Sequence, residues 1–115
     1  MKRYLIFIIL FIFWGSCTYD NEEDVFGIDN CTTDPVTFTN HIDPILKANC
    51  ALPGCHVSGR QIPDLTDLNQ IQNSAIQIKH RTSNRTMPPP ESGKNLTRSE
   101  IEQISCWVDS GAIND

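Results

Sequence analysis

The feature that most constrains this chain is the run Cys-Ala-Leu-Pro-Gly-Cys-His, from Cys50 to His56. Two cysteines with a histidine directly after the second form the pattern of covalent haem attachment, in which the thiols add to the haem vinyl groups and the imidazole ligates the iron. The domain around this run is short, and a core of that size is marginal without a disulfide, metal or cofactor. A buried haem would supply much of the missing apolar volume.

Four residues separate Cys50 from Cys55, whereas the common haem-attachment spacing leaves two. Pro53 and Gly54 lie within this interval and predict a turn. Such a turn would fold the additional residues outward and bring Cys50 back toward Cys55. We therefore expect both cysteines to bind haem, with a single thioether at Cys55 as the alternative.

Two haem-free interpretations of the same residues remain open. Cys50 and Cys55 can form a local disulfide that leaves His56 in an exposed loop, as expected of small exported domains. Zinc is the second interpretation, bound by Cys50, Cys55, His56 and one further ligand, although the sequence offers no second ligand pair at a suitable spacing.

Met87 is the candidate for the other axial ligand of the iron. It lies 31 residues after His56 and is followed by three prolines, which fix φ and stiffen the backbone that would hold the thioether. His80 is the rival, because it would give bis-histidine ligation. We favour Met87, since methionine and histidine together are an established ligand pair of cytochromes c.

The N-terminal residues predict export. Lys2 and Arg3 precede an apolar run over residues 4–14, which at ~1.5 Å per residue spans only about half of a ~30 Å hydrocarbon core. Residues 1–16 therefore indicate a secretory signal peptide, with a short uncleaved anchor as the alternative. Gly15 and Ser16 before Cys17 resemble a bacterial lipobox, so Cys17 is the expected lipidation site. The alternative role of Cys17 is a disulfide partner.

Charge separates the chain into an acidic tether, residues 17–34, and a domain, residues 35–115. The chain has 9 basic and 14 acidic residues, and loss of Lys2 and Arg3 with the signal leaves 7 against 14, a net charge of −7. Such a balance argues against nucleic acid as a partner and suits a basic partner or simple solubility. We expect the protein to be held on a bacterial membrane, on its periplasmic side or at the cell surface, by lipid on Cys17.

Three helices are predicted, and no segment shows the alternation typical of a strand. The first covers about residues 40–49, with Pro44 in its opening turn. The second covers about residues 67–79. The third begins at Thr97 and Glu100, which form the sequence signature of a capping box. The expected fold is a small all-α domain with long loops.

Three separated motifs, in this order, resemble those of small c-type cytochrome domains, particularly the planctomycete-type and Bacteroidetes lipoprotein members. The resemblance covers about Val36 to Asn114. Its motifs are a "PIL…C…CH" opening, an "MPP" loop and a closing "W-[IV]-x-x-GA" helix. They lie in this sequence at Phe38 to Leu46 with Cys50 to His56, at Met87 to Pro89, and at Ile104 to Ala112.

The resemblance implies one covalent haem c, a compact cytochrome c-like helical fold, and His56 and Met87 as axial ligands. It further implies single-electron transfer to redox partner proteins rather than enzymatic catalysis. Cys31 and Cys106 would then form a disulfide that pins the tether to the last helix. Two other functions stay open: a haem-free, disulfide-stapled structural or binding lipoprotein, and a haem enzyme or gas sensor in which Met87 is labile or not a ligand.

Overall fold

The structure, a computed structural model, describes Cys31 and residues 35–115. The predicted signal peptide, the lipidation site Cys17 and the rest of the tether lie outside these residues. In the described part of the chain, no helix is long and apolar enough to cross a membrane.

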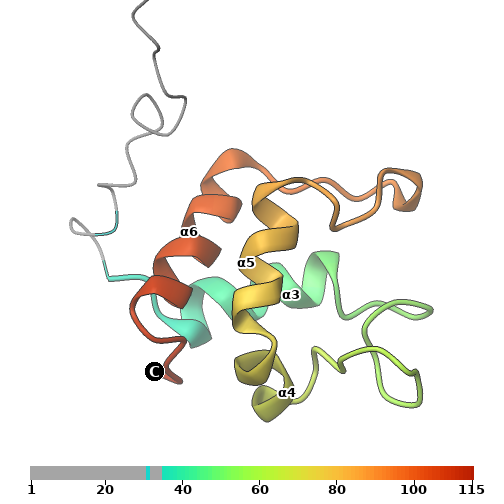
Figure 1. The fold of residues 1–115 in the computed structure, drawn as a ribbon, viewed down its shortest axis with the longest axis horizontal. Helices are drawn as coiled ribbons and strands as arrows, with labels where there is room; N and C mark the ends of the chain where they lie inside the picture. The colour runs from blue at the N-terminus through green and yellow to red at the C-terminus, as the bar shows by residue number, and fades with distance from the viewer. Residues whose placement is uncertain (1–30, 32–34) are drawn as a thin grey trace, which may run out of the picture.

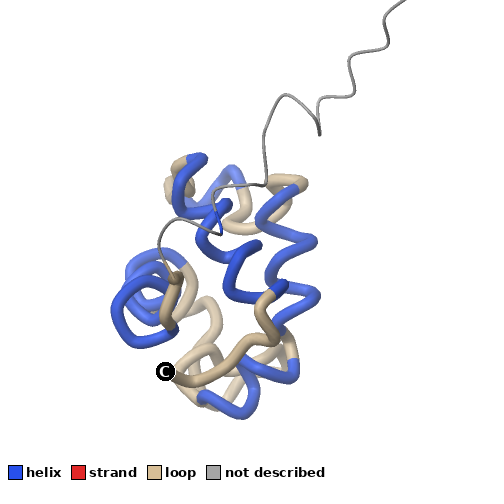
Figure 2. Tube along the Cα trace, turned by 90° about the vertical axis from the view of Figure 1, so that its left-hand side faces the viewer, coloured by secondary structure: helices blue, strands red, loops and turns tan. Residues whose placement is uncertain are grey.

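The described residues form a small helical domain, and they contain no strand (Figures 1 and 2). This confirms the all-α prediction for that part of the chain. The elements, in chain order, are the π-helical turn η2 (Phe38–Ile42), α3 (Asp43–Asn49), α4 (Leu68–Asn73), α5 (Ala75–Ser83), the 3₁₀ turn η3 (Pro90–Ser92) and α6 (Arg98–Asp109).

The first predicted helix is present and begins earlier than expected. The turn η2 runs directly into α3, so the chain is helical from Phe38 to Asn49. Thr37 caps this start, since its hydroxyl accepts a hydrogen bond from the backbone N–H of Asn40. Pro44 lies in the first turn of α3, where a missing N–H costs little.

The second predicted helix is two helices, so the expectation of one continuous helix over residues 67–79 is wrong. Ser74 adopts φ −99° and ψ 1°, and its N–H bonds back to Gln70 and Ile71, which ends α4. Asn73 and Ser74 are weak helix formers because their side chains compete for backbone hydrogen bonds. After this break α5 starts in a new direction and extends to Ser83.

The capping box at the start of α6 is formed as predicted. The Thr97 hydroxyl accepts from the Glu100 N–H at 3.2 Å, and the Glu100 carboxylate accepts from the Thr97 N–H at 2.7 Å. These two bonds satisfy two of the backbone donors that a helix start leaves unpaired. They fix where α6 begins and therefore which of its residues face the core.

The core lies where α6 packs against η2 and α5, and α3 packs against η2. Trp107 is fully buried, its ring centroid is 5.7 Å from that of Phe38, and its indole N–H donates to the Ile113 carbonyl at 2.8 Å. The other buried apolar residues come from every helix and from the loops between them: Ile42, Ile45, Leu46, Cys50, Leu65, Ile71, Ala75, Leu96, Ile104 and Ala112.

The two ends of the domain meet. The Phe38 N–H donates to the Asp115 side chain at 2.8 Å, and the Thr39 N–H donates to the Asp115 backbone oxygen at 3.1 Å. Gln72 also donates to the Ala112 carbonyl at 2.8 Å, which holds the chain after α6 against α4.

Candidate functional site

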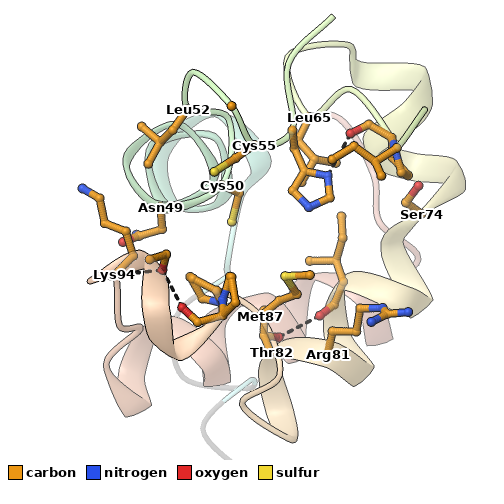
Figure 3. A pocket seen from close by; sticks show the side chains of 18 of the residues that line it. Asn49, Cys50, Leu52, Cys55, Leu65, Ser74, Arg81, Thr82, Met87 and Lys94 are labelled. Atoms are coloured by element: carbon orange, nitrogen blue, oxygen red, sulfur yellow. Dashed lines mark hydrogen bonds between the residues drawn. The ribbon is translucent and has the colours of Figure 1, made fainter. Parts of the chain in front are cut away.

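A cavity of about 780 Å³ opens between three segments of the chain. They are the end of α3 with the loop that follows it (residues 49–65), one face of α5 with its N-cap (residues 74–82) and the proline-rich loop after α5 (residues 87–94). Figure 3 shows side chains from all three segments pointing toward the same space. Pockets that bind a small molecule or cofactor typically have volumes of roughly 300–1,000 Å³.

The Cys-to-His run folds back on itself at the cavity wall. The Cys55 N–H donates to the Leu52 carbonyl at 2.8 Å, and Gly54, inside this turn, has φ +84°. Glycine adopts such a positive φ at no steric cost, which explains its place after Pro53. The His56 N–H then donates to the Cys50 carbonyl at 3.1 Å. The predicted Pro-Gly turn is confirmed, and it brings the backbone of Cys50 next to that of His56.

Cys50 and Cys55 are both free thiols that line the cavity. Cys50 is buried, and the loss of solvation raises the pKa of its thiol to about 11, with smaller contributions from the neighbouring Cys55 and Glu100. Cys50 therefore carries no charge at neutral pH. Cys55 is half-buried, and the disulfide between these two cysteines is not formed in the structure.

His56 is held at both its backbone and its ring. The Leu65 N–H donates to the His56 carbonyl at 3.1 Å, which closes the loop from residue 56 to residue 65. Nδ1 of the ring lies 2.9 Å from the Pro63 carbonyl oxygen. Because a carbonyl only accepts, Nδ1 donates the hydrogen of this contact, and in the neutral ring Nε2 then has the lone pair. This is the arrangement by which proteins orient a metal-binding histidine.

Met87 contributes to the cavity from the opposite wall. It is half-buried, and its N–H donates to the Arg81 carbonyl at 3.1 Å, which fixes the loop against the last turn of α5. In Figure 3 its side chain lies across the cavity from Cys50 and Cys55. His80, the rival ligand, is exposed on α5 and is not among the residues that line the cavity.

Two cations line the cavity, Arg81 and Lys94, and neither forms an ion pair with a described residue. Three of the domain's other cations are paired, Lys47 with Asp43, Lys79 with Asp109, and Arg98 with Glu102. The cavity wall thus combines apolar side chains with two positive charges that no ion pair among the described residues neutralises.

Sequence reasoning placed Arg81 near the methionine loop, but it missed Lys94 and the other α5 residues that line this site. The lining residues of α5 recur every three to four positions, at 74, 77, 78, 81 and 82, which is the spacing of one helix face. That spacing was visible in the sequence. The break at Ser74, which sets the direction of this face, was not.

Cys31 and Cys106 form a disulfide with a Cα–Cα distance of 5.3 Å. Neither residue lines the cavity. This bridge is compatible with both the haem-bound and the haem-free interpretation.

Among Cys31 and residues 35–115, no three His, Cys, Asp or Glu side chains gather closely enough to hold a metal ion. The zinc interpretation needs four protein ligands in a closed site, and it finds no such set in this part of the chain. A haem iron needs only one or two protein ligands, because the porphyrin supplies the rest.

Comparisons of the chain with known protein families, with curated proteins and with solved structures gave no match.

Proposed function

We propose that this protein is a c-type cytochrome that carries single electrons. The observation that carries the proposal is that Cys50, Cys55, His56 and Met87 all line one cavity. These residues are spread over 38 positions of the sequence (50 to 87), and haem that is attached to the cysteines and ligated by His56 and Met87 requires that they meet.

The character of the cavity also suits haem. Its volume of about 780 Å³ falls in the range of cofactor pockets. Leu52, Leu65 and Ile78 give it apolar walls, while the neutral Cys50 thiol adds no charge to be desolvated. A largely apolar ring with a charged edge can bind in such a cavity, because the apolar walls contact the ring and Arg81 and Lys94 provide cations for its edge.

Each residue has a distinct role in this proposal. Cys50 and Cys55 would hold haem c through thioethers, and His56 and Met87 would ligate its iron. The bond from Nδ1 of His56 to the Pro63 carbonyl orients the ring and increases its basicity as a ligand. When bound, the haem supplies an iron that takes up and releases one electron.

Whether Met87 stays bound to the iron distinguishes an electron carrier from a haem enzyme or gas sensor. A thioether that is held on the sixth position excludes other ligands and favours ferrous iron, which raises the reduction potential relative to bis-histidine ligation. The anchor of the Met87 N–H on the Arg81 carbonyl supports a held rather than a labile ligand. We therefore propose electron transfer to redox partner proteins, with export and a lipid anchor on Cys17.

The experiment is a pyridine haemochrome spectrum of protein produced in a host with haem c assembly machinery. The protein is denatured and extracted with acid and acetone first, so that only covalently bound haem is counted. We expect retained haem, and the position of the α band distinguishes two thioethers from one. Cys50→Ala and Cys55→Ala are the matched variants, and each should leave a single thioether.

A colourless product whose Cys50 and Cys55 are joined in a disulfide would overturn the proposal. That result would identify a haem-free, disulfide-stapled lipoprotein instead. Haem that is lost on extraction would also count against covalent attachment.

A further inference from the structure

The face that α5 turns to the cavity has two characters. Ile78 and the buried Thr82 form the apolar part. The Thr82 hydroxyl donates to the Ile78 carbonyl at 2.8 Å, so it is already satisfied within the helix. Ser74, Gln77 and Arg81 give it a polar part along one edge of the helix. The α5 wall of the cavity therefore offers a bound molecule an apolar surface and, along one edge of that surface, a polar border.

The polar border lies away from the cysteines. In Figure 3 Ser74 and Arg81 occupy one end of the view, Asn49, Leu52 and Lys94 occupy the other, and Met87 and Thr82 lie between them. Cys50 and Cys55 lie toward the end with Leu52. A ligand attached to these cysteines would thus direct its opposite edge toward Arg81.

Arg81 has a charge that no described residue neutralises. Its backbone is fixed, because its carbonyl accepts from the N–H groups of both Thr86 and Met87. A guanidinium on a fixed backbone at the border of an apolar cavity is suited to a carboxylate, which it can bind through two parallel hydrogen bonds.

We propose that Arg81 binds a propionate carboxylate of the haem and so sets the orientation of the ring in the cavity. This inference rests on the proposed function. Haem carries its vinyl groups and its propionates on opposite edges, so attachment at Cys50 and Cys55 and a carboxylate at Arg81 define one orientation. Ser74 and Gln77 add hydrogen-bond donors on the same border. Arg81 is a positioning residue, since it acts on the iron only through the propionate.

The test compares five variants of the haem-loaded protein: Arg81→Gln, Arg81→Glu, Arg81→Lys, Lys94→Gln and Arg85→Gln. Arg85 is the matched control, because it lies four residues away, has the same charge, and does not line the cavity. All five substitutions leave the Arg81 carbonyl in place, so the anchor of Met87 is retained. The readouts are the midpoint potential at pH 7 and the propionate bending bands of the resonance Raman spectrum.

Loss of a cation near the haem favours ferric iron. For Arg81→Gln we expect the ratio of ferrous to ferric haem at a fixed potential to fall about threefold, which is ~30 mV for a one-electron couple. Arg81→Glu should shift the potential about twice as far in the same direction. Arg81→Lys should restore most of the potential. A propionate band should move in Arg81→Gln and stay in Arg85→Gln.

Three results would overturn the inference while leaving the cytochrome intact. The first is an equal midpoint potential in Arg81→Gln and Arg85→Gln, and the second is a set of propionate bands that do not respond to Arg81→Gln. The third is a larger shift of the midpoint potential in Lys94→Gln than in Arg81→Gln, which would place the propionates at the Lys94 end of the cavity. A wild-type chain without covalent haem would instead refute the proposed function itself. The two failures are therefore distinguishable.

Discussion

The disulfide between Cys31 and Cys106 is expected to supply a large part of the domain's stability. It closes a loop with a sequence separation of 75 residues, which contains the cavity and almost every helix. In the chain-entropy description, closing such a loop removes about 15 cal/mol/K from the unfolded ensemble, or about 4.5 kcal/mol at 25 °C. The Cα–Cα distance of 5.3 Å is within the usual range for disulfides.

The perturbation is the double variant Cys31→Ser with Cys106→Ser, which leaves no unpaired thiol from this bridge. We expect its free energy of unfolding to fall by about 3–4.5 kcal/mol. Small domains have a total stability of about 5–15 kcal/mol, so this loss would leave the variant marginal. The assay is urea unfolding followed by the fluorescence of the buried Trp107, with the slope m fitted for each protein.

A reductant provides the control for this experiment. Dithiothreitol should lower the wild-type stability to that of the double variant, and it should leave the double variant unchanged. A loss below about 1 kcal/mol with an unchanged m would refute the reasoning, because it would show that the unfolded chain gains little freedom from the open loop. A loss of similar size in the reductant-treated double variant would show an effect of the reagent itself.

Two further predictions concern the cavity. Met87→Ala should let the reduced protein bind carbon monoxide, because this substitution frees the sixth position of the iron. His80 is exposed, so His80→Ala should leave the reduced protein unreactive toward carbon monoxide. Absorption spectra show the binding, and the reverse pattern would make His80 the ligand. In haem-free Cys55→Ser protein, alkylation of Cys50 should quicken about tenfold per pH unit between pH 8 and 10, since burial raises its pKa to about 11 and only the thiolate reacts. Mass spectrometry gives this rate, and a plateau by pH 9 would contradict the assigned burial.

Local signals predicted the start of α6 and the turn within the Cys-to-His run. Thr97 and Glu100 satisfy each other's backbone, and Pro53 with Gly54 forms a turn whatever the rest of the chain does. These interactions span at most four residues, so the sequence contains all of the information they need. The break at Ser74 was missed because the apolar spacing continues across it. A weak helix former ends a helix only where the tertiary structure favours a change of direction.

The candidate ligands could be predicted from the sequence, but the shape and the full lining of the cavity could not. The Cys-to-His run and Met87 stand out by their chemistry, and the sequence brought them together only through a resemblance. That Lys94 lines the cavity while Arg85 does not depends on how the loop after α5 folds back. Such a path is set by contacts between distant segments, and periodicity within one segment cannot report it.

The first and last residues of the helical domain meet on the side of the domain away from the cavity. Asp115 is bonded to Phe38 and Thr39, whereas the lining of the cavity comes only from residues between Asn49 and Lys94. In Figure 1 the chain end lies on one side and the loops that enclose the cavity extend on the other. A domain attached through either end, to a surface, an electrode or a longer polypeptide, would therefore present its cavity outward, and such modules could be joined in series without blocking one another's openings.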